Sequence, residues 1–221
     1  EIKTLRAKER LEFRDQSNNG AFEVPTFEEV IDLAIAKSQE TGRTIGLYPE
    51  TKHPSYFDSI GLSLEEPLVA MLTKKGLDQR QSPVFIQSFE MSNLKQLNGM
   101  IEVKLVQLME AADKQPFDLV AAGDKRTYAD LAKPEGLKEI ATYADGIGPY
   151  KRLIVPEDGN KVLLAPTSLV ADAHAVGLLV HPYTFRSEAQ YLAKEYGGDP
   201  AREYRQFFEL GVDGLFSDFP D

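Results

Sequence analysis

The sequence contains no cysteine, only three histidines, and fewer basic than acidic residues. Its 221 residues include 25 Lys and Arg against 35 Asp and Glu, a formal net charge of −10 at pH 7. The lack of cysteine excludes disulfides, thiolate metal sites and a cysteine nucleophile, and leaves the cellular compartment open. The negative charge disfavours nonspecific binding to nucleic acid, because such binding depends on Lys and Arg neutralising phosphates. No apolar run approaches the ~20 residues of a membrane-spanning helix.

What the chain does contain is an ordinary hydrophobic content, 42%, arranged in two alternating patterns. Short apolar runs alternate with stretches of helical period, which predicts a parallel sheet with helical crossovers. We expect strands over 44–50, 84–88, 104–109, 146–149, 178–183 and 214–217. We expect helices over 27–40 with Thr26 as N-cap, 63–75 capped by Ser63, 92–97, 134–143, 168–176 and 199–210, and an amphipathic helix at the N-terminus.

The predicted strand 44–50 leads into a carboxylate and an ammonium two residues apart, Glu50 and Lys52. Alternate residues of a strand share a face, so both side chains project from one edge. A carboxylate suits a hard cation and an ammonium suits an anionic oxygen; the alternative is a solvated salt bridge between the two. The six predicted strands all end in polar or aromatic groups, as barrel enzymes build their sites: Glu50, Gln87, Gln107, Pro149, His181 and Asp218.

Several of these segments together resemble the glycerophosphodiester phosphodiesterase family, in its longer periplasmic or secreted branch. They are Tyr48-Pro49-Glu50-Thr51-Lys52, Val84 to Phe89, Asp145 to Pro149, His181 to Arg186 and Asp218-Phe219-Pro220-Asp221. The resemblance implies an α/β fold, a TIM-type (β/α)8 barrel. It also implies hydrolysis of a glycerophosphodiester to glycerol 3-phosphate and an alcohol, with Ca²⁺ or Mg²⁺ as cofactor and a periplasmic or secreted location.

The chain departs from the family pattern at two strand ends. The family's first strand carries His-Arg-Gly and its second Glu-x-Asp, and neither motif occurs ahead of Thr44. We therefore expect residues 1–221 to be a single barrel domain, incomplete at its N-terminus, that supplies about six of the eight βα units. We assign no catalytic residue, because the family's paired histidines lie on the two absent strands. The chain alone is expected to be inactive, with the missing N-terminal segment or a homo-oligomer as its partner.

The resemblance assigns the remaining site residues. Glu50 corresponds to a metal ligand, and the expected substrate-binding residues are Lys52, His181, Tyr183, Gln87, Phe89 and Arg186. Three of these have structural alternatives: a buried histidine for His181, barrel packing for Tyr183, and an ion pair with Glu188 for Arg186. Two other functions stay open, a non-catalytic binding protein on the same barrel and a related barrel phospholipase. The phospholipase would need a lipid-docking surface, which the sequence does not indicate.

Overall fold

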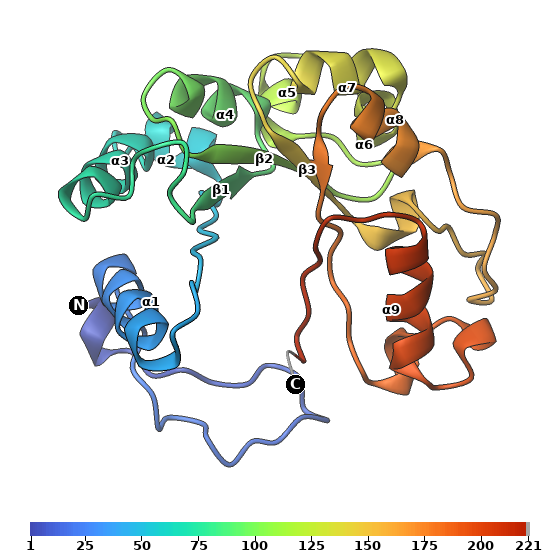
Figure 1. The fold of residues 1–221 in the computed structure, drawn as a ribbon, viewed down its shortest axis with the longest axis horizontal. Helices are drawn as coiled ribbons and strands as arrows, with labels where there is room; N and C mark the ends of the chain where they lie inside the picture. Colours follow the sequence, from blue (N-terminus) through green and yellow to red (C-terminus); the bar gives the residue numbers. More distant parts are fainter. Residues whose placement is uncertain (220–221) are drawn as a thin grey trace. The chain divides into compact units, whose positions relative to one another are not determined.

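The computed structural model describes residues 1–219 and divides into two compact units, Glu1–Leu47 and Tyr48–Asp221 (Figure 1). The single domain expected from the sequence stays a prediction. In the first unit, helix α1 (Phe27–Thr41) begins after Thr26 as predicted. The Thr26 hydroxyl accepts a hydrogen bond from the Glu29 N–H, and the Glu29 carboxylate accepts one from the Thr26 N–H, which completes a capping box.

The amphipathic helix expected at the N-terminus is wrong. That stretch forms only a 3₁₀ turn, η1 (Ile2–Thr4), which buries no residue. Ile2 and Leu5 are 45% and 57% exposed, so the apolar side chains that define the pattern are not buried. A short helix in water depends on such burial, because its nucleation is unfavourable.

The second unit is built on a parallel sheet. Its strands are β1 (Phe85–Ser88), β2 (Lys104–Met109), β3 (Gly146–Pro149) and β4 (Leu179–Val180), in the order β1-β2-β3-β4. All three pairings are parallel. Neighbours in the sheet are therefore neighbours in the chain, as expected of an α/β fold with helical crossovers.

The outermost predicted strands are reduced to single bridges, which corrects two of the strand predictions. Glu50 bridges Gln87 and Ser217 bridges Phe185, both in parallel. Pro49 has no N–H to donate, so it cannot extend a ladder. The six segments still follow the predicted order, and within residues 1–219 the sheet does not close into a barrel.

Strand β4 is also shorter than the predicted 178–183. Its N–H groups continue to donate to β3 as far as Tyr183, which donates to the Pro149 carbonyl at 3.1 Å, but Pro149 on β3 has no N–H to donate back. Tyr183 accordingly forms an isolated parallel bridge with Tyr150. The end of this strand therefore keeps its place in the sheet although its ladder is interrupted.

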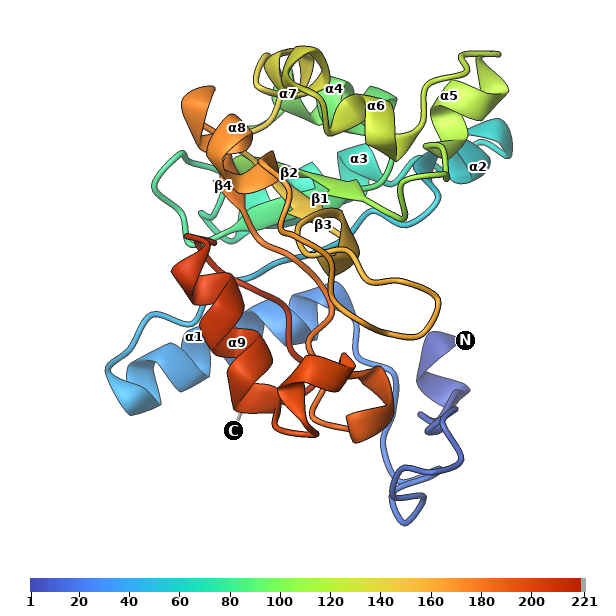
Figure 2. The same ribbon diagram turned by 90° about the vertical axis from the view of Figure 1, so that its right-hand side faces the viewer.

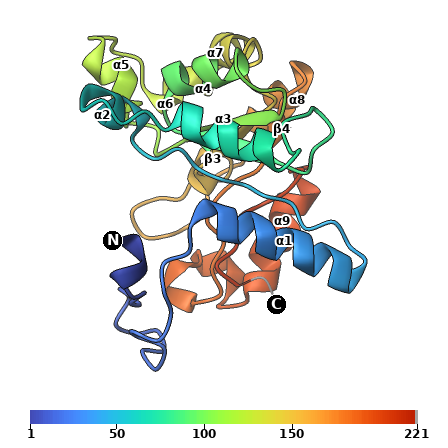
Figure 3. The same ribbon diagram turned by 90° about the vertical axis from the view of Figure 1, so that its left-hand side faces the viewer.

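Helices cover one face of the sheet, and α4 to α8 lie along it in two views (Figures 1 and 2). Figure 3 shows α3 beside α4. Asp199 caps α9, at the predicted position of this helix, whereas α3 begins after Leu64, so Ser63 is not its N-cap. The Ser63 hydroxyl donates to the carboxylates of Glu65 and Glu66 instead. The helices are α2 (Pro54–Ser59), α3 (Glu65–Lys74), α4 (Met91–Asn98), α5 (Phe117–Ala121), α6 (Tyr128–Leu131), α7 (Pro134–Ile140), α8 (Leu169–Ala175) and α9 (Pro200–Glu209).

The core lies between the sheet and this helical layer. The strands contribute four side chains that are at most 1% exposed, Ile86, Leu105, Ile147 and Val180. Helices α4, α7 and α8 contribute four that are fully buried, Leu94, Leu97, Leu137 and Ala173. Burying one such aliphatic side chain stabilises the fold by roughly 1.5–3 kcal/mol. Alternate strand residues point to the opposite face, where the polar strand ends gather. Among residues 1–219, no helix has both the length and the apolar character needed to cross a bilayer.

Candidate functional site

A cavity of about 200 Å³ lies at the carboxyl end of the sheet. It is bounded by the turn that follows Glu50, by the residues that follow β1, and by the segment that follows β2. Its lining mixes charged and aromatic groups: Glu50, Thr51, Lys52, His53, Pro54, Phe89, Glu90, Glu110, Gln115, Phe117 and Tyr128. Three of the residues predicted from the sequence, Glu50, Lys52 and Phe89, therefore meet at one cavity.

Glu50 and Lys52 are both exposed, while Thr51 between them is buried. Within residues 1–219, neither charged side chain has a hydrogen bond or an ion pair, so the salt bridge between them that the sequence left open is not present. A carboxylate and an ammonium without partners are free to bind a ligand at no cost in broken protein contacts. Glu50 and Lys52 thus meet the first requirement of the predicted metal and phosphate roles.

Buried side chains hold the turn that carries these two groups. Thr51 Oγ1 donates to Asn93 Oδ1 at 2.6 Å, and the Asn93 amide donates in turn to the buried carboxylate of Glu65. At the other end of the turn, the buried Glu90 carboxylate accepts from both the backbone N–H (3.1 Å) and the hydroxyl of Ser55. Fully paired buried networks of this kind fix a local conformation.

Phe89 is held from behind by Gln107. The Gln107 amide donates to the Ser88 and Phe89 carbonyls at 3.3 and 3.0 Å, and its Oε1 accepts from the Tyr143 hydroxyl at 2.9 Å. Each polar atom of this buried amide has a partner, as expected of a buried side chain. The backbone that presents the Phe89 ring to the cavity is thereby fixed.

The Phe89 ring packs edge-on against two tyrosines. Its centroid is 6.4 Å from that of Tyr128 and 6.1 Å from that of Tyr183. Burial raises the pKa of both phenols, and the negative charge of Glu110 adds to both shifts. The two phenols therefore stay protonated at neutral pH.

Gln87 and His181 are buried and lie outside the lining of this cavity. Gln87 is 8% exposed, and its Oε1 has no hydrogen-bond partner in the described part of the chain. His181 is 9% exposed; its Nδ1 lies 2.8 Å from the Tyr48 hydroxyl and its ring is edge-on to Phe85. Burial lowers the pKa of His181 and Asp213 opposes that shift. Their substrate-binding roles stay predictions, and the surroundings of His181 fit its structural alternative.

Arg186 and Tyr183 line a second cavity, of about 300 Å³. Arg186 Nε lies 2.8 Å from Asp218 Oδ2, and its guanidinium stacks 4.7 Å from the ring centroid of Tyr191. The Tyr183 hydroxyl donates to the Met109 carbonyl at 3.1 Å. Tyr183 packs on Phe89 of the first cavity, but both Tyr183 and Arg186 line the second cavity alone.

The donor set for a metal is incomplete within the described residues. Glu50 fits as one oxygen ligand for a hard cation, since its carboxylate is exposed and unpaired. Residues 1–219 contain no group of three or more His, Asp or Glu side chains arranged to hold a metal ion. One carboxylate is too few ligands for Ca²⁺ or Mg²⁺ on its own, so further ligands are required.

Glu110, Phe117 and Tyr128 are among the lining residues that were not predicted from the sequence. Glu110 could have been found, because it is the first polar residue after the predicted strand 104–109. Phe117 and Tyr128 come from the starts of α5 and α6, and neither is part of a strand-end pattern. Only the folded path of the segment after β2 brings them to the cavity.

Comparisons with known proteins agree with this geometry. The model of the glycerophosphoryl diester phosphodiesterase family matches residues 1–221. The chain is 38% identical over 232 residues to glycerophosphodiester phosphodiesterase GDPD6 of Arabidopsis thaliana, an alignment covering 99% of the chain and 60% of that relative. It is 31% identical over 212 residues to a glycerophosphodiester phosphodiesterase of Haemophilus influenzae, covering 90% of the chain and 57% of that relative.

A solved structure shares the fold. The chain resembles the crystal structure of a protein from Silicibacter pomeroyi assigned as a glycerophosphoryl diester phosphodiesterase, with a TM-score of 0.62 at 18% identity. The match covers 93% of this chain and 57% of that one. The chain thus spans less than two thirds of the length of the proteins it matches here. As its strand-end motifs predicted, the chain belongs to the glycerophosphoryl diester phosphodiesterase family, which has a TIM-type α/β barrel fold.

Proposed function

We propose that the whole protein hydrolyses glycerophosphodiesters with a divalent metal ion, and releases glycerol 3-phosphate and an alcohol. The observation that carries the proposal is the pair of exposed, unpaired charges, Glu50 and Lys52, at a cavity on the carboxyl end of a parallel sheet. Barrel enzymes place their sites at that end. The names of the relatives from Arabidopsis thaliana and Haemophilus influenzae support the reaction class.

Lys52 meets the main electrostatic demand of this reaction. A phosphodiester is an anion that repels nucleophiles, and negative charge builds on its free oxygens as the bond to the incoming oxygen forms. The Lys52 ammonium, on a flexible stem, would contact those oxygens and follow their movement. Glu50 would be one ligand of the metal, which when bound neutralises phosphate charge.

Among the described residues, no histidine is held in a fixed orientation at the cavity. His174 Nε2 lies 2.9 Å from Asp213 Oδ2, and His181 is buried against the Tyr48 hydroxyl. His53 is exposed and lines the cavity, yet within residues 1–219 its ring has no hydrogen bond or ion pair that would hold it in one position. We therefore propose that the acid–base groups belong to other parts of the whole protein. The periplasmic or secreted location and the homo-oligomer stay predictions.

A non-catalytic binding protein is the second candidate. It is favoured by two facts about the described residues: they hold no group of three metal ligands, and neither of the two histidines with hydrogen-bond partners lines the cavity. Such a protein would bind the diester through Lys52 without releasing product. The two candidates make opposite predictions for turnover and the same prediction for binding.

The experiment that separates them measures glycerol 3-phosphate release from glycerophosphocholine and glycerophosphoglycerol by the whole protein. We expect a chelator to abolish release and Ca²⁺ or Mg²⁺ to restore it. We also expect Glu50→Gln to need more metal than the wild type for half-maximal rate. Binding of the diesters by a metal-loaded protein that releases no product would establish the binding protein. Product release that is unchanged by the chelator would refute the metal dependence of the reaction.

A further inference from the structure

We propose that the cavity beside Glu50 selects diesters whose alcohol carries a positive charge, a quaternary or primary ammonium. Glu110 and Phe117 would be the residues that determine this specificity. The inference rests on the proposed function, because it names the substrate class of the same site. Three features of the cavity support it: the charge of its lining, its aromatic walls, and the contacts that fix those walls.

The lining carries an excess of negative charge. Three carboxylates, Glu50, Glu90 and Glu110, face one ammonium, Lys52. Glu90 is bound to Ser55 and is 2% exposed, and Glu50 and Lys52 are assigned to the metal and the phosphate. Glu110 remains, and within residues 1–219 its exposed carboxylate has neither a hydrogen bond nor an ion pair. An unpaired carboxylate beside the phosphate position attracts a cationic substituent on the same substrate.

Aromatic rings line the same cavity as Glu110. Phe89 and Tyr128 pack edge-on to each other, and Tyr128 is 2% exposed. Phe117, at the start of α5, is 53% exposed and lines the cavity, so it is accessible to a ligand there. Ring faces attract an ammonium through their quadrupole, most of all a quaternary ammonium that sheds its water easily. Aromatic rings together with a free carboxylate favour a cation over a neutral or anionic group.

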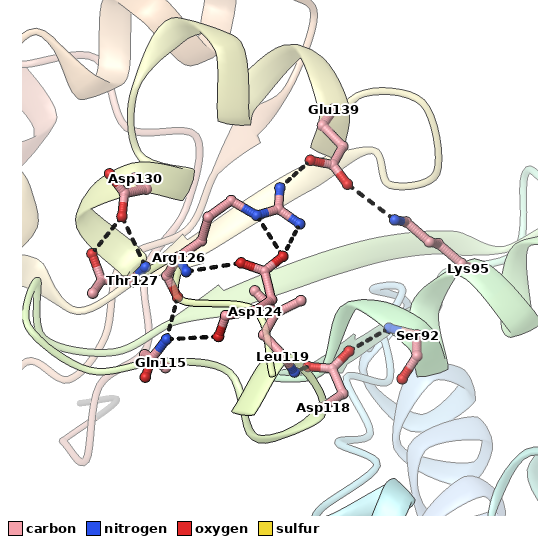
Figure 4. A network of polar contacts seen from close by, with 10 residues as sticks. All are labelled: Ser92, Lys95, Gln115, Asp118, Leu119, Asp124, Arg126, Thr127, Asp130 and Glu139. Atoms are coloured by element: carbon pink, nitrogen blue, oxygen red, sulfur yellow. Dashed lines mark hydrogen bonds and ion pairs between the residues drawn. The ribbon is translucent and has the colours of Figure 1, made fainter. Parts of the chain in front are cut away.

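Polar contacts hold the segment that carries Phe117 and Tyr128 (Figure 4). The Gln115 amide donates to the carbonyls of Asp124 and Arg126 at 3.1 and 3.0 Å, which closes the loop between the two rings. The Asp118 carboxylate accepts from the Ser92 N–H at 2.7 Å and ties α5 to the start of α4.

The far end of the segment is fixed in the same way. Arg126 pairs with Asp124 at 2.9 Å and with Glu139 at 2.5 Å, and Glu139 also binds Lys95 at 3.1 Å (Figure 4). A capping box at Thr127 starts α6, where Tyr128 is the first residue. Walls that are already ordered lose little entropy when a ligand binds, so weak cation contacts translate into selectivity.

The test compares two substrates in the whole protein, cationic glycerophosphocholine and neutral glycerophosphoglycerol. The readout is the ratio of their kcat/KM values. We expect Glu110→Gln to lower this ratio about tenfold and Phe117→Ala to lower it about threefold, in line with the contributions of a charge contact and an exposed cation–π contact. An equal loss for both substrates would overturn the proposal, because Glu110 would then serve the metal or the phosphate.

Two matched controls come from the same chain. Glu102→Gln makes the same change in charge at the amino end of β2, where its side chain is exposed. Phe208→Ala removes a ring on α9 that is 57% exposed, close to the 53% of Phe117. Both controls are expected to keep the wild-type ratio. A control that lowers the ratio as much as Glu110→Gln would contradict the assignment.

A second readout needs no turnover and separates this inference from the proposed function. Binding of choline chloride to the wild type and to Glu110→Gln can be measured by saturation-transfer NMR. Choline binding that weakens about tenfold in Glu110→Gln, in a protein that hydrolyses neither diester, would support the cation site and refute the hydrolase. The opposite result is that Glu110→Gln hydrolyses both diesters with the wild-type ratio of kcat/KM values and binds choline as tightly as the wild type. That result would refute the cation site and support the hydrolase.

Discussion

Lys52 and Lys151 have opposite surroundings. Lys151 is 4% exposed; its Nζ lies 2.7 Å from Glu203 Oε2 and 5.2 Å from the ring centroid of Phe185. Burial lowers the pKa of Lys151, and Glu203 opposes that shift. Lys52 is exposed, and in the described part of the chain it has no ion pair.

This difference separates charges that hold the fold from charges that are free for a ligand. A buried charge must be paired, because leaving it without a partner costs several kcal/mol. Glu203 serves two cations at once, since Arg152 also lies 3.3 Å from its Oε1, and Arg152 has a second partner in Glu157 at 3.0 Å. An exposed charge such as Lys52 contributes little to stability, so the fold does not constrain what it binds.

The largest expected effect on stability follows from removing the shared anion. We expect Glu203→Leu to lower the free energy of unfolding by about 3–5 kcal/mol, because Lys151 is left buried without an anionic partner. Urea denaturation of the whole protein measures this. The matched control is Glu209→Leu, an exposed glutamate on the same helix, α9. If Glu203→Leu loses no more free energy of unfolding than Glu209→Leu, the charge of Lys151 is not structural and the contrast with Lys52 is refuted.

The largest expected effect on activity follows from Lys52. We expect Lys52→Met to lower kcat/KM about a hundredfold or more, the size of effect seen when a donor to a developing negative charge is removed. The free energy of unfolding should change by less than about 0.5 kcal/mol, as at other exposed positions. Lys138→Met, an exposed lysine on α7, is the control for both measurements. Comparable loss of activity in the control would contradict a phosphate contact.

His181 sharpens the comparison, because it is a buried titratable group that has no ion pair among the described residues. Its pKa is lowered by burial from the ordinary value of 6.5. As the pH falls through 6.5, the unfolded chain takes up a proton that the folded protein resists. The stability that His181 contributes is therefore complete above pH 6.5 and is lost as the pH falls through its lower folded pKa.

Denaturation between pH 7.5 and pH 5 tests the sign of this effect. The slope from one such group is at most about 1.4 kcal/mol per pH unit. We expect His181→Gln to lose less stability on acidification than the wild type, and His53→Asn, at an exposed histidine, to follow the wild type. A steeper loss in His181→Gln would mean that His181 gains a proton on folding, against the direction inferred from its burial.

Much of the fold could be predicted because the signals are local. The capping box at Thr26 and the apolar runs of β1, β2 and β3 each specify their own element. The two outer strands, 44–50 and 214–217, were predicted too long. Each has a neighbour on one side only, and a proline in such a segment or in its neighbour removes one of the hydrogen bonds of the ladder. The prediction of an N-terminal helix was wrong, because an apolar pattern does not show whether its side chains will be buried in the folded protein.

The residues of the candidate site also fall into those that could be predicted from the sequence and those that could not. Glu50, Lys52 and Phe89 follow strand ends, so an alternating pattern and a family resemblance locate them. Phe117 and Tyr128 reach the cavity through the loop closed by Gln115, and no periodicity encodes that path. The surroundings of His181 could not be predicted either, because its hydrogen-bond partner Tyr48 lies 133 positions away in the sequence.

The most direct test of the division between free and structural charges compares turnover per folded molecule in two variants of the whole protein. Glycerophosphodiester hydrolysis and the folded fraction are measured together for Lys52→Met and Glu203→Leu. We expect Lys52→Met to be fully folded and nearly inactive, and Glu203→Leu to be less stable, with each folded molecule turning over within about threefold of wild type. A Lys52→Met protein that keeps its turnover, or loses it only by unfolding, would contradict the account.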